Sequence, residues 1–131
     1  MAAVNALALS IQLLLATQSR TDVQPLKNEL ANISIDSLSI ELSSEDARRT
    51  FWINCYNAYV RILIREKSPD LYTQSSRTAF FSSKLIVIAG QPLSLNDIEH
   101  GMLRNSKIWW SFGYLNKFSK NKFEKQFRVH R

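Results

Sequence analysis

The stretch FWINCYNAYV, residues 51–60, decides the fold, because it has the pattern of the middle of a long buried helix. At 100° per residue, its apolar side chains cover most of the helix circumference, which is typical of a helix enclosed by its domain. One narrow polar stripe remains, formed by Thr50, Asn54, Asn57 and Arg61. A buried amide without a partner costs about 1–3 kcal/mol. We therefore expect Asn54 and Asn57 to bond to the backbone of a neighbouring loop or strand, either as a structural clamp or to orient a catalytic base.

The only cysteine, Cys55, lies beside Phe51 and Ile62, about 100° away from the polar stripe. A reactive thiolate usually lies at a helix N-terminus or next to a cation. Cys55 has neither in the sequence, so we expect an inert thiol that packs in the core. One cysteine excludes an internal disulfide, and two distant histidines do not complete a zinc site. No metal or other cofactor is expected, and the compartment stays open, with a reducing cytoplasm favoured.

Two signals bound this helix. Ser43, followed by Asp46 three residues later, matches a capping box at the start, and Ser68 before Pro69 predicts an end near Lys67. Residues 33–42 alternate in places and could pair as a strand, but we expect an irregular segment there. Residues 70–83 are polar and rich in Ser and Thr, so we expect a surface loop with short turns.

The residues after this loop predict a strand and a second helix. The β-branched run KLIVIAG (84–90) is typical of a strand, and QPLSL makes the return. Ser94 or Asn96 then caps a helix with the sequence NDIEHGMLRN. The sequence therefore predicts an α+β domain with a long buried central helix, a short β-hairpin or small sheet, and flanking helices.

The N-terminal residues predict further helices. Apolar side chains recur at helical spacing at Val4, Leu7, Ile11 and Leu14, which favours an amphipathic helix packed on the core over a signal peptide. Pro25 suits the first position of a short second helix.

Charge and length suggest how the chain is divided. Six of the 17 basic residues but only one of the 11 acidic residues fall within residues 117–131. We expect one globular domain over residues 1–116, incomplete at its C-terminal side, and a basic aromatic tail or truncated continuation over residues 117–131. A charge run is usually a solvated linker, so neither nucleic acid nor a membrane surface is an expected partner. The aromatic-basic C-terminal region, with Trp109 and Trp110, remains the place where a protein partner could bind.

His100 is the candidate catalytic residue. Asp97 precedes it by three residues, Glu99 is adjacent, and Arg104 follows by four. A carboxylate that accepts the imidazole N–H fixes the tautomer and raises the histidine pKa, which is the usual way to orient a base. The simpler interpretation is a helix-surface or half-buried histidine bonded to local groups.

Two segments together resemble one family, the domain of unknown function family 547 (DUF 547). FWINCYNAYV resembles its signature Phe-Trp-Ile-Asn-x-Tyr-Asn-Ala, and GQPLSLNDIEHGMLR resembles its second signature, in which a Leu-x-Asp-Ile-Glu-His core leads to Leu-Arg. The resemblance implies an α+β domain built around the aromatic helix and brings no established activity. It places family-typical residues at Asn54, Tyr56, Asn57, Ile98, Glu99, His100, Leu103 and Arg104.

The resemblance leaves two functions open. Some members resemble papain-like thiol hydrolases, although the position of Cys55 is variable in the family pattern. The usual continuation, similar to Arg-x-His-Phe-Ala-Leu-x-Cys-Gly, would begin about where the chain reads FRVHR, so we expect a truncated domain. One hypothesis is a Cys/His hydrolase or transferase in the intact protein, and the other is a non-catalytic protein-interaction module. In the first, His100 is the base and its surroundings are shaped by Asn54, Tyr56, Asn57, Asp97, Glu99 and Arg104.

Overall fold

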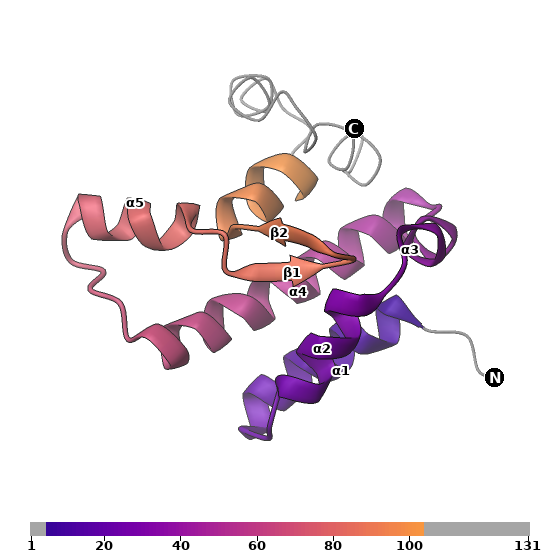
Figure 1. Ribbon diagram of the computed structural model, residues 1–131, viewed down its shortest axis with the longest axis horizontal. Coiled ribbons are helices and arrows are strands. Elements are labelled where there is room, and N and C mark those ends of the chain that lie inside the picture. The colour runs from indigo at the N-terminus through magenta and orange to yellow at the C-terminus, as the bar shows by residue number, and fades with distance from the viewer. Residues whose placement is uncertain (1–4, 104–131) are drawn as a thin grey trace.

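The fold is α+β, with α-helices packed around a two-stranded antiparallel hairpin (Figure 1). The computed structural model describes residues 5–103, so the predictions for Val4, Arg104, the two tryptophans and the C-terminal tail lie outside the described residues. In chain order the elements are α1 (Ala6–Ser19), α2 (Gln24–Asn32), α3 (Ile35–Glu41), α4 (Glu45–Lys67), α5 (Gln74–Ser82), β1 (Ile86–Ile88), β2 (Gln91–Leu93) and the π-helix η1 (Asp97–Leu103).

The central helix α4 confirms the main prediction, with a one-residue shift at its start. Ser44, and not Ser43, is the N-cap, and its hydroxyl accepts a hydrogen bond from the Ala47 N–H at 3.0 Å. At the other end Ser68 takes a left-handed conformation with φ 44° and donates its N–H to the Ile64 carbonyl at 3.0 Å. Both ends are therefore satisfied by local hydrogen bonds.

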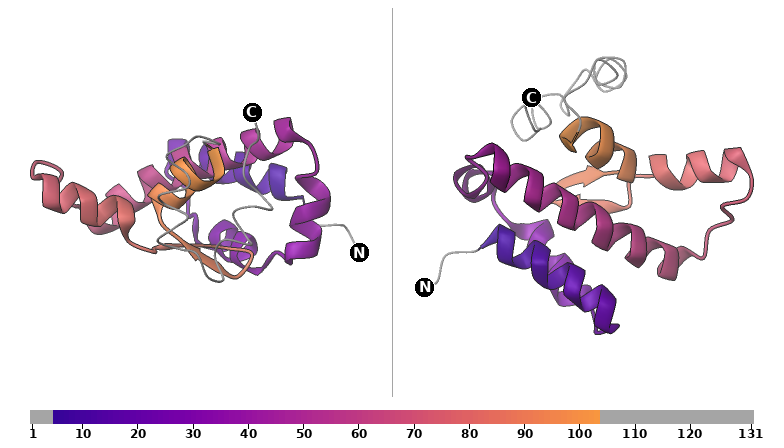
Figure 2. Two further views of the ribbon diagram at one scale, coloured as in Figure 1. Left: turned by 90° about the horizontal axis from the view of Figure 1, so that it is seen from above. Right: turned by 180° about the vertical axis from the view of Figure 1, so that it is seen from behind.

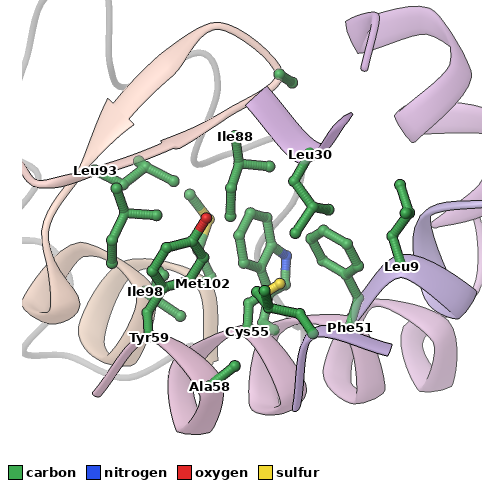
Figure 3. Packing of buried hydrophobic residues seen from close by; sticks show 14 of the residues in the cluster. Leu9, Leu30, Phe51, Cys55, Ala58, Tyr59, Ile88, Leu93, Ile98 and Met102 are labelled. Carbon is green, nitrogen blue, oxygen red and sulfur yellow. The ribbon is translucent and has the colours of Figure 1, made fainter. Parts of the chain in front are cut away.

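The core lies on one side of α4, where it meets the hairpin, η1, α1 and α2 (Figure 3). Phe51 and Trp52 are fully buried and pack edge to face, with ring centroids 4.8 Å apart. The opposite side of α4 faces solvent: Ile53 is 40% exposed and Ile64 is 39% exposed. The central helix is thus buried on one side rather than on nearly every face, and Asn57, expected to be buried, is exposed.

Helix α1 was correctly predicted, and its buried face was predicted in part. Leu7 and Leu14 are half-buried and pack against the core as expected, whereas Ile11 is 46% exposed. The deeper core positions of this helix are Leu9 and Leu13. The segment is rich in leucine, so several stripes fit helical spacing and the pattern alone does not choose among them. No helix within residues 5–103 combines the length and apolar content needed to cross a membrane.

Two short helices replace segments expected to be irregular or loop. In α3 the Ser34 hydroxyl accepts the Ser37 N–H at 3.1 Å, and in α5 the Thr73 hydroxyl accepts the Ser76 N–H at 3.2 Å. A side-chain hydroxyl thus caps the N-terminus of each helix. Because both segments contain several Ser or Thr residues, the sequence alone does not show which of them is the cap. Helix α5 matters for function, because it forms one wall of the candidate site.

The hairpin turn joins the sheet to α2. Ala89 and Gly90 both have positive φ, 54° and 74°, as a two-residue hairpin turn that matches the strand twist requires. Their N–H groups donate to the carbonyls of Leu30 and Ala31, each at 2.9 Å, and so satisfy the C-terminal end of α2.

Replacing Gly90 with alanine is expected to lower the free energy of unfolding by about 1 kcal/mol, because an L side chain is strained at this φ. A Cβ added there meets no heavy atom within 4 Å, so the cost is conformational and not steric. Urea denaturation of Gly90→Ala and of Gly90→Asn measures it. Since asparagine tolerates the left-handed region better, a larger loss for Gly90→Asn would contradict this account.

Candidate functional site

The two signature segments meet through the side chains of Tyr56 and Glu99. Tyr56 lies on α4 and Glu99 on η1, 43 positions later, and the tyrosine hydroxyl donates a hydrogen bond to Glu99 Oε1 at 3.1 Å. Both side chains are half-buried. The bond therefore stands at the border between the core and the surface and connects the two most distinctive parts of the sequence.

A groove of about 370 Å³ opens beside this pair, between α4, α5 and η1. It is lined by Tyr56, Arg77, Thr78, Phe81, Asn96 and Glu99, which we call the signature groove. The lining combines a carboxylate, a guanidinium, an amide, two hydroxyls and two aromatic rings, so it offers hydrogen-bond donors and acceptors together with apolar surface.

Arg77 is held in place by the loop before α5. Its Nη1 donates to the Leu71 carbonyl at 2.9 Å and to the Tyr72 carbonyl at 3.1 Å. Among the described residues no carboxylate lies within ion-pair distance of Arg77. Since two bonds fix one end of the guanidinium, its remaining donors are oriented before any ligand arrives.

A capping box at Ser94 positions η1. The Ser94 hydroxyl accepts the Asp97 N–H at 3.0 Å, and Asp97 Oδ2 accepts the Ser94 N–H at 2.8 Å. The same oxygen accepts a bond from Lys84 Nζ at 2.5 Å. Ser94, and not Asn96, is therefore the cap, while the Asn96 side chain lines the groove. Asp97 is fully buried and serves as the anchor of this segment.

His100 has a different environment from the one that its spacing predicts. No hydrogen bond joins it to Asp97 or Glu99 within the described range, and its Nδ1 is buried without a partner. The winding of η1 explains this, because a π-helix has i→i+5 bonds and residues three apart no longer lie on one face. Single π-turns are rare and occur frequently at functional sites, which draws attention to this segment.

The two asparagines lie away from the signature groove. Asn54 Nδ2 donates to the Ser10 hydroxyl at 3.2 Å, so it bonds to a side chain of α1 and not to the backbone of a loop or strand. On a helix, residues 54 and 56 point about 200° apart, so Asn54 cannot face the same side as Tyr56. Asn57 is exposed. The structure brings Tyr56 and Glu99 together and leaves Asn54 as a link between α1 and α4.

Cys55 is a packing residue, as predicted. It is fully buried, its side chain points into the core near Phe51 (Figure 3), and burial raises the pKa of its thiol far above the usual range. The thiolate, which is the nucleophilic form, is therefore suppressed at neutral pH.

We expect Cys55 to react with a thiol reagent such as 5,5′-dithiobis(2-nitrobenzoate) only when the protein unfolds. The native rate should be at least about 10³-fold below the rate in denaturing urea, because modification requires opening of the core. Rapid modification of the native chain would contradict a purely structural role.

Several residues of the signature groove are missed by sequence reasoning. Arg77, Thr78 and Phe81 belong to α5, which the composition suggests is a loop, and Asn96 stands out only as a possible cap. The Thr73 cap, followed by the apolar pair Phe80-Phe81, is the signal that could have indicated the helix. Within residues 5–103 no group of three His, Cys, Asp or Glu side chains is placed to hold a metal ion.

The described residues define an α+β domain in which a long aromatic helix and a π-helical segment share one groove. A family model described as "Protein of unknown function, DUF547" matches residues 40–131, a range that includes both signatures. The chain belongs to this family. No match was found among curated proteins or solved structures. Helices α1 and α2 precede the matched range, although α1 packs along α4.

Proposed function

We propose that this domain is a protein-interaction module and that the signature groove binds a short polypeptide segment. The observation that carries the proposal is the bond between Tyr56 and Glu99, because it brings both family signatures to the wall of one groove. A groove of about 370 Å³ is within the range of small-ligand sites and has room for a few peptide residues.

The chemistry of the lining supports a peptide. The Asn96 amide has both a donor and an acceptor, as the peptide group does, and Phe81 offers an apolar face to a side chain. Glu99 and Arg77 bring opposite charges to the same groove. The preferred segment therefore carries a basic side chain that faces Glu99 and an acidic side chain that faces Arg77.

A titration with blocked dipeptides tests this proposal. N-acetyl-Lys-Glu-amide is added to the full chain while amide chemical shifts are followed, and N-acetyl-Gln-Glu-amide is the matched peptide without the basic group. We expect the first to bind better by about tenfold or more, since a charged hydrogen bond is lost in the second.

Glu99→Gln supplies the matched protein variant. The glutamine oxygen can still accept from Tyr56, so only the charge is removed. The variant should bind both peptides equally weakly. If it retains the preference for the lysine peptide, or if the shifts lie outside the signature groove, the proposal fails.

Catalysis of the Cys/His hydrolase or transferase kind is a second candidate, favoured by the buried and unpartnered Nδ1 of His100 next to Glu99. His100 would act as the base, and the nucleophile would be a group other than Cys55, whose pKa is raised. Hydrolysis of 4-nitrophenyl acetate should then fall about 10²-fold or more in His100→Gln. Equal rates in the two proteins would remove this candidate.

A further inference from the structure

A second groove, which is separate from the signature groove, lies between the C-terminal parts of α1 and α4. It has a volume of about 420 Å³ and is lined by Gln18, Arg20, Arg61, Ile64 and Arg65, which we call the arginine groove. Within the described part of the chain, its lining has three guanidinium groups and no carboxylate. We infer that the arginine groove binds a phosphate group.

The two helices that form this groove run side by side in the same direction (Figure 2). Asn54 on α4 bonds to Ser10 on α1, and about three turns further along α4 Arg65 shares the groove with Arg20, the C-cap of α1. The arginines are therefore brought together by the packing of two helices and not by sequence alone.

The nearby carboxylates do not neutralise this cluster. Glu66 forms its ion pair with Lys27 at 3.1 Å, and Asp22 Oδ1 accepts the Gln24 N–H at 3.0 Å. None of the three arginines forms an ion pair within residues 5–103. Among the described residues, the lining of the arginine groove itself therefore has a net positive charge, which attracts anions.

Helix stability explains only part of this arrangement. Arg65 lies in the last turn of α4, where a cation interacts favourably with the helix dipole. Arg61 lies one turn earlier, and like charges at i and i+4 repel each other. Arg20 has φ 61°, a conformation in which glycine is usual at a helix end. Arg61 and Arg20 are therefore both unfavourable for the stability of the free protein. A bound anion would relieve the charge repulsion between Arg61 and Arg65.

Phosphate is the anion that fits these donors. The planar guanidinium donates two parallel hydrogen bonds to phosphate oxygens, and several arginines together favour a dianion over a carboxylate. An adjoining groove of about 310 Å³ shares Arg20 and Arg65 and adds the apolar side chains of Val23 and Ile62. Asp22 and Glu66 also line it, and their carboxylates disfavour a second anionic group there. The ligand is therefore a phosphate ester with a small apolar part, either a soluble ester or a lipid headgroup.

Binding of inorganic pyrophosphate to the full chain, measured by isothermal titration calorimetry, tests the site. Arg61→Gln should weaken binding by about tenfold or more, because it removes charge-assisted hydrogen bonds. Arg49→Gln is the matched control, since Arg49 is exposed on the same helix near its other end. An equal loss in both variants would mean general charge attraction and would overturn the inference.

Arg20→Gly is a second, independent variant. Glycine relieves the left-handed backbone, so the melting temperature in phosphate-free buffer should rise while pyrophosphate binding weakens about tenfold. A purely structural arginine would not produce these opposite effects. Unchanged binding in this variant would also overturn the inference.

Vesicles distinguish the two sources of phosphate. The protein is floated with phosphatidylcholine vesicles that contain phosphatidylinositol phosphate. If flotation is lost in Arg61→Gln and kept in Arg49→Gln, the ligand is a lipid headgroup. Binding of soluble pyrophosphate without flotation assigns it to a soluble ester. Binding of neither probe refutes the site, and none of these outcomes depends on the signature groove.

Discussion

Phe51→Ala is expected to lower the free energy of unfolding by about 3–5 kcal/mol, the range for removing a buried aromatic ring. Phe51 is fully buried, and its ring packs edge to face on Trp52 at 4.8 Å. The substitution removes that contact and leaves a cavity beside Leu9 and Leu30, at the end of the core where α4, α1 and α2 meet (Figure 3). Urea denaturation followed by circular dichroism measures the loss.

The neighbouring Ile53 is the matched control. It lies on the same helix but is 40% exposed, so Ile53→Ala should cost about 1 kcal/mol or less. A similar loss for both variants would contradict the one-sided burial of α4.

The sequence of residues 51–60 correctly predicts the central helix of the fold but wrongly predicts how much of its surface is buried. The apolar positions of α4 exceed what one buried face needs, so Ile53 and Ile64 look like core residues and are in fact exposed. Exposed apolar residues are common on folded proteins, and periodicity alone does not reveal them. Asn57 was expected to be buried for the same reason, because a helix that is apolar on most of its circumference was expected to be enclosed on every side.

The sequence predicted several residues of the candidate site but not which of them contact each other. The family resemblance picked out Tyr56 and Glu99, yet their contact depends on the tertiary path between α4 and η1. The spacing of Asp97 and His100 assumed an α-helix, whereas the seven residues of η1 wind as a π-helix. Ile98 and Met102 of this segment are buried in the core, and their spacing of four residues in the sequence does not distinguish a π-helix from an α-helix.

Core and site are linked through η1. Ile98 and Met102 pack in the core near Tyr59 on α4 (Figure 3), while Glu99, between them, reaches Tyr56. The position of the carboxylate in the signature groove thus depends on how firmly η1 is held. Two groups of interactions hold it: the apolar contacts of these two residues, and the polar anchor at Asp97.

Asp97→Ala should therefore lower the free energy of unfolding by about 1–3 kcal/mol. It removes the carboxylate half of the capping box and leaves the buried Ser94 N–H without its acceptor, at about 1–3 kcal/mol, while the Ser94 hydroxyl can still accept the backbone N–H of residue 97. Loss of the Lys84 pair adds little, since that side chain is 40% exposed and can turn to water. Urea denaturation measures the sum.

Asp46 provides the contrast for this prediction. Its carboxylate lies 3.5 Å from Arg49, but the side chain is almost fully exposed, so Asp46→Ala should cost no more than about 1 kcal/mol. Asp97→Asn should fall between the two alanine variants, because the amide oxygen still accepts the Ser94 N–H but has no charge. If both alanine variants cost the same, Asp97 does not anchor η1.

If Asp97→Ala is strongly destabilised, the remaining folded protein should also lose its preference for the lysine dipeptide, because the capping box sets where η1 begins and so where Glu99 faces the groove.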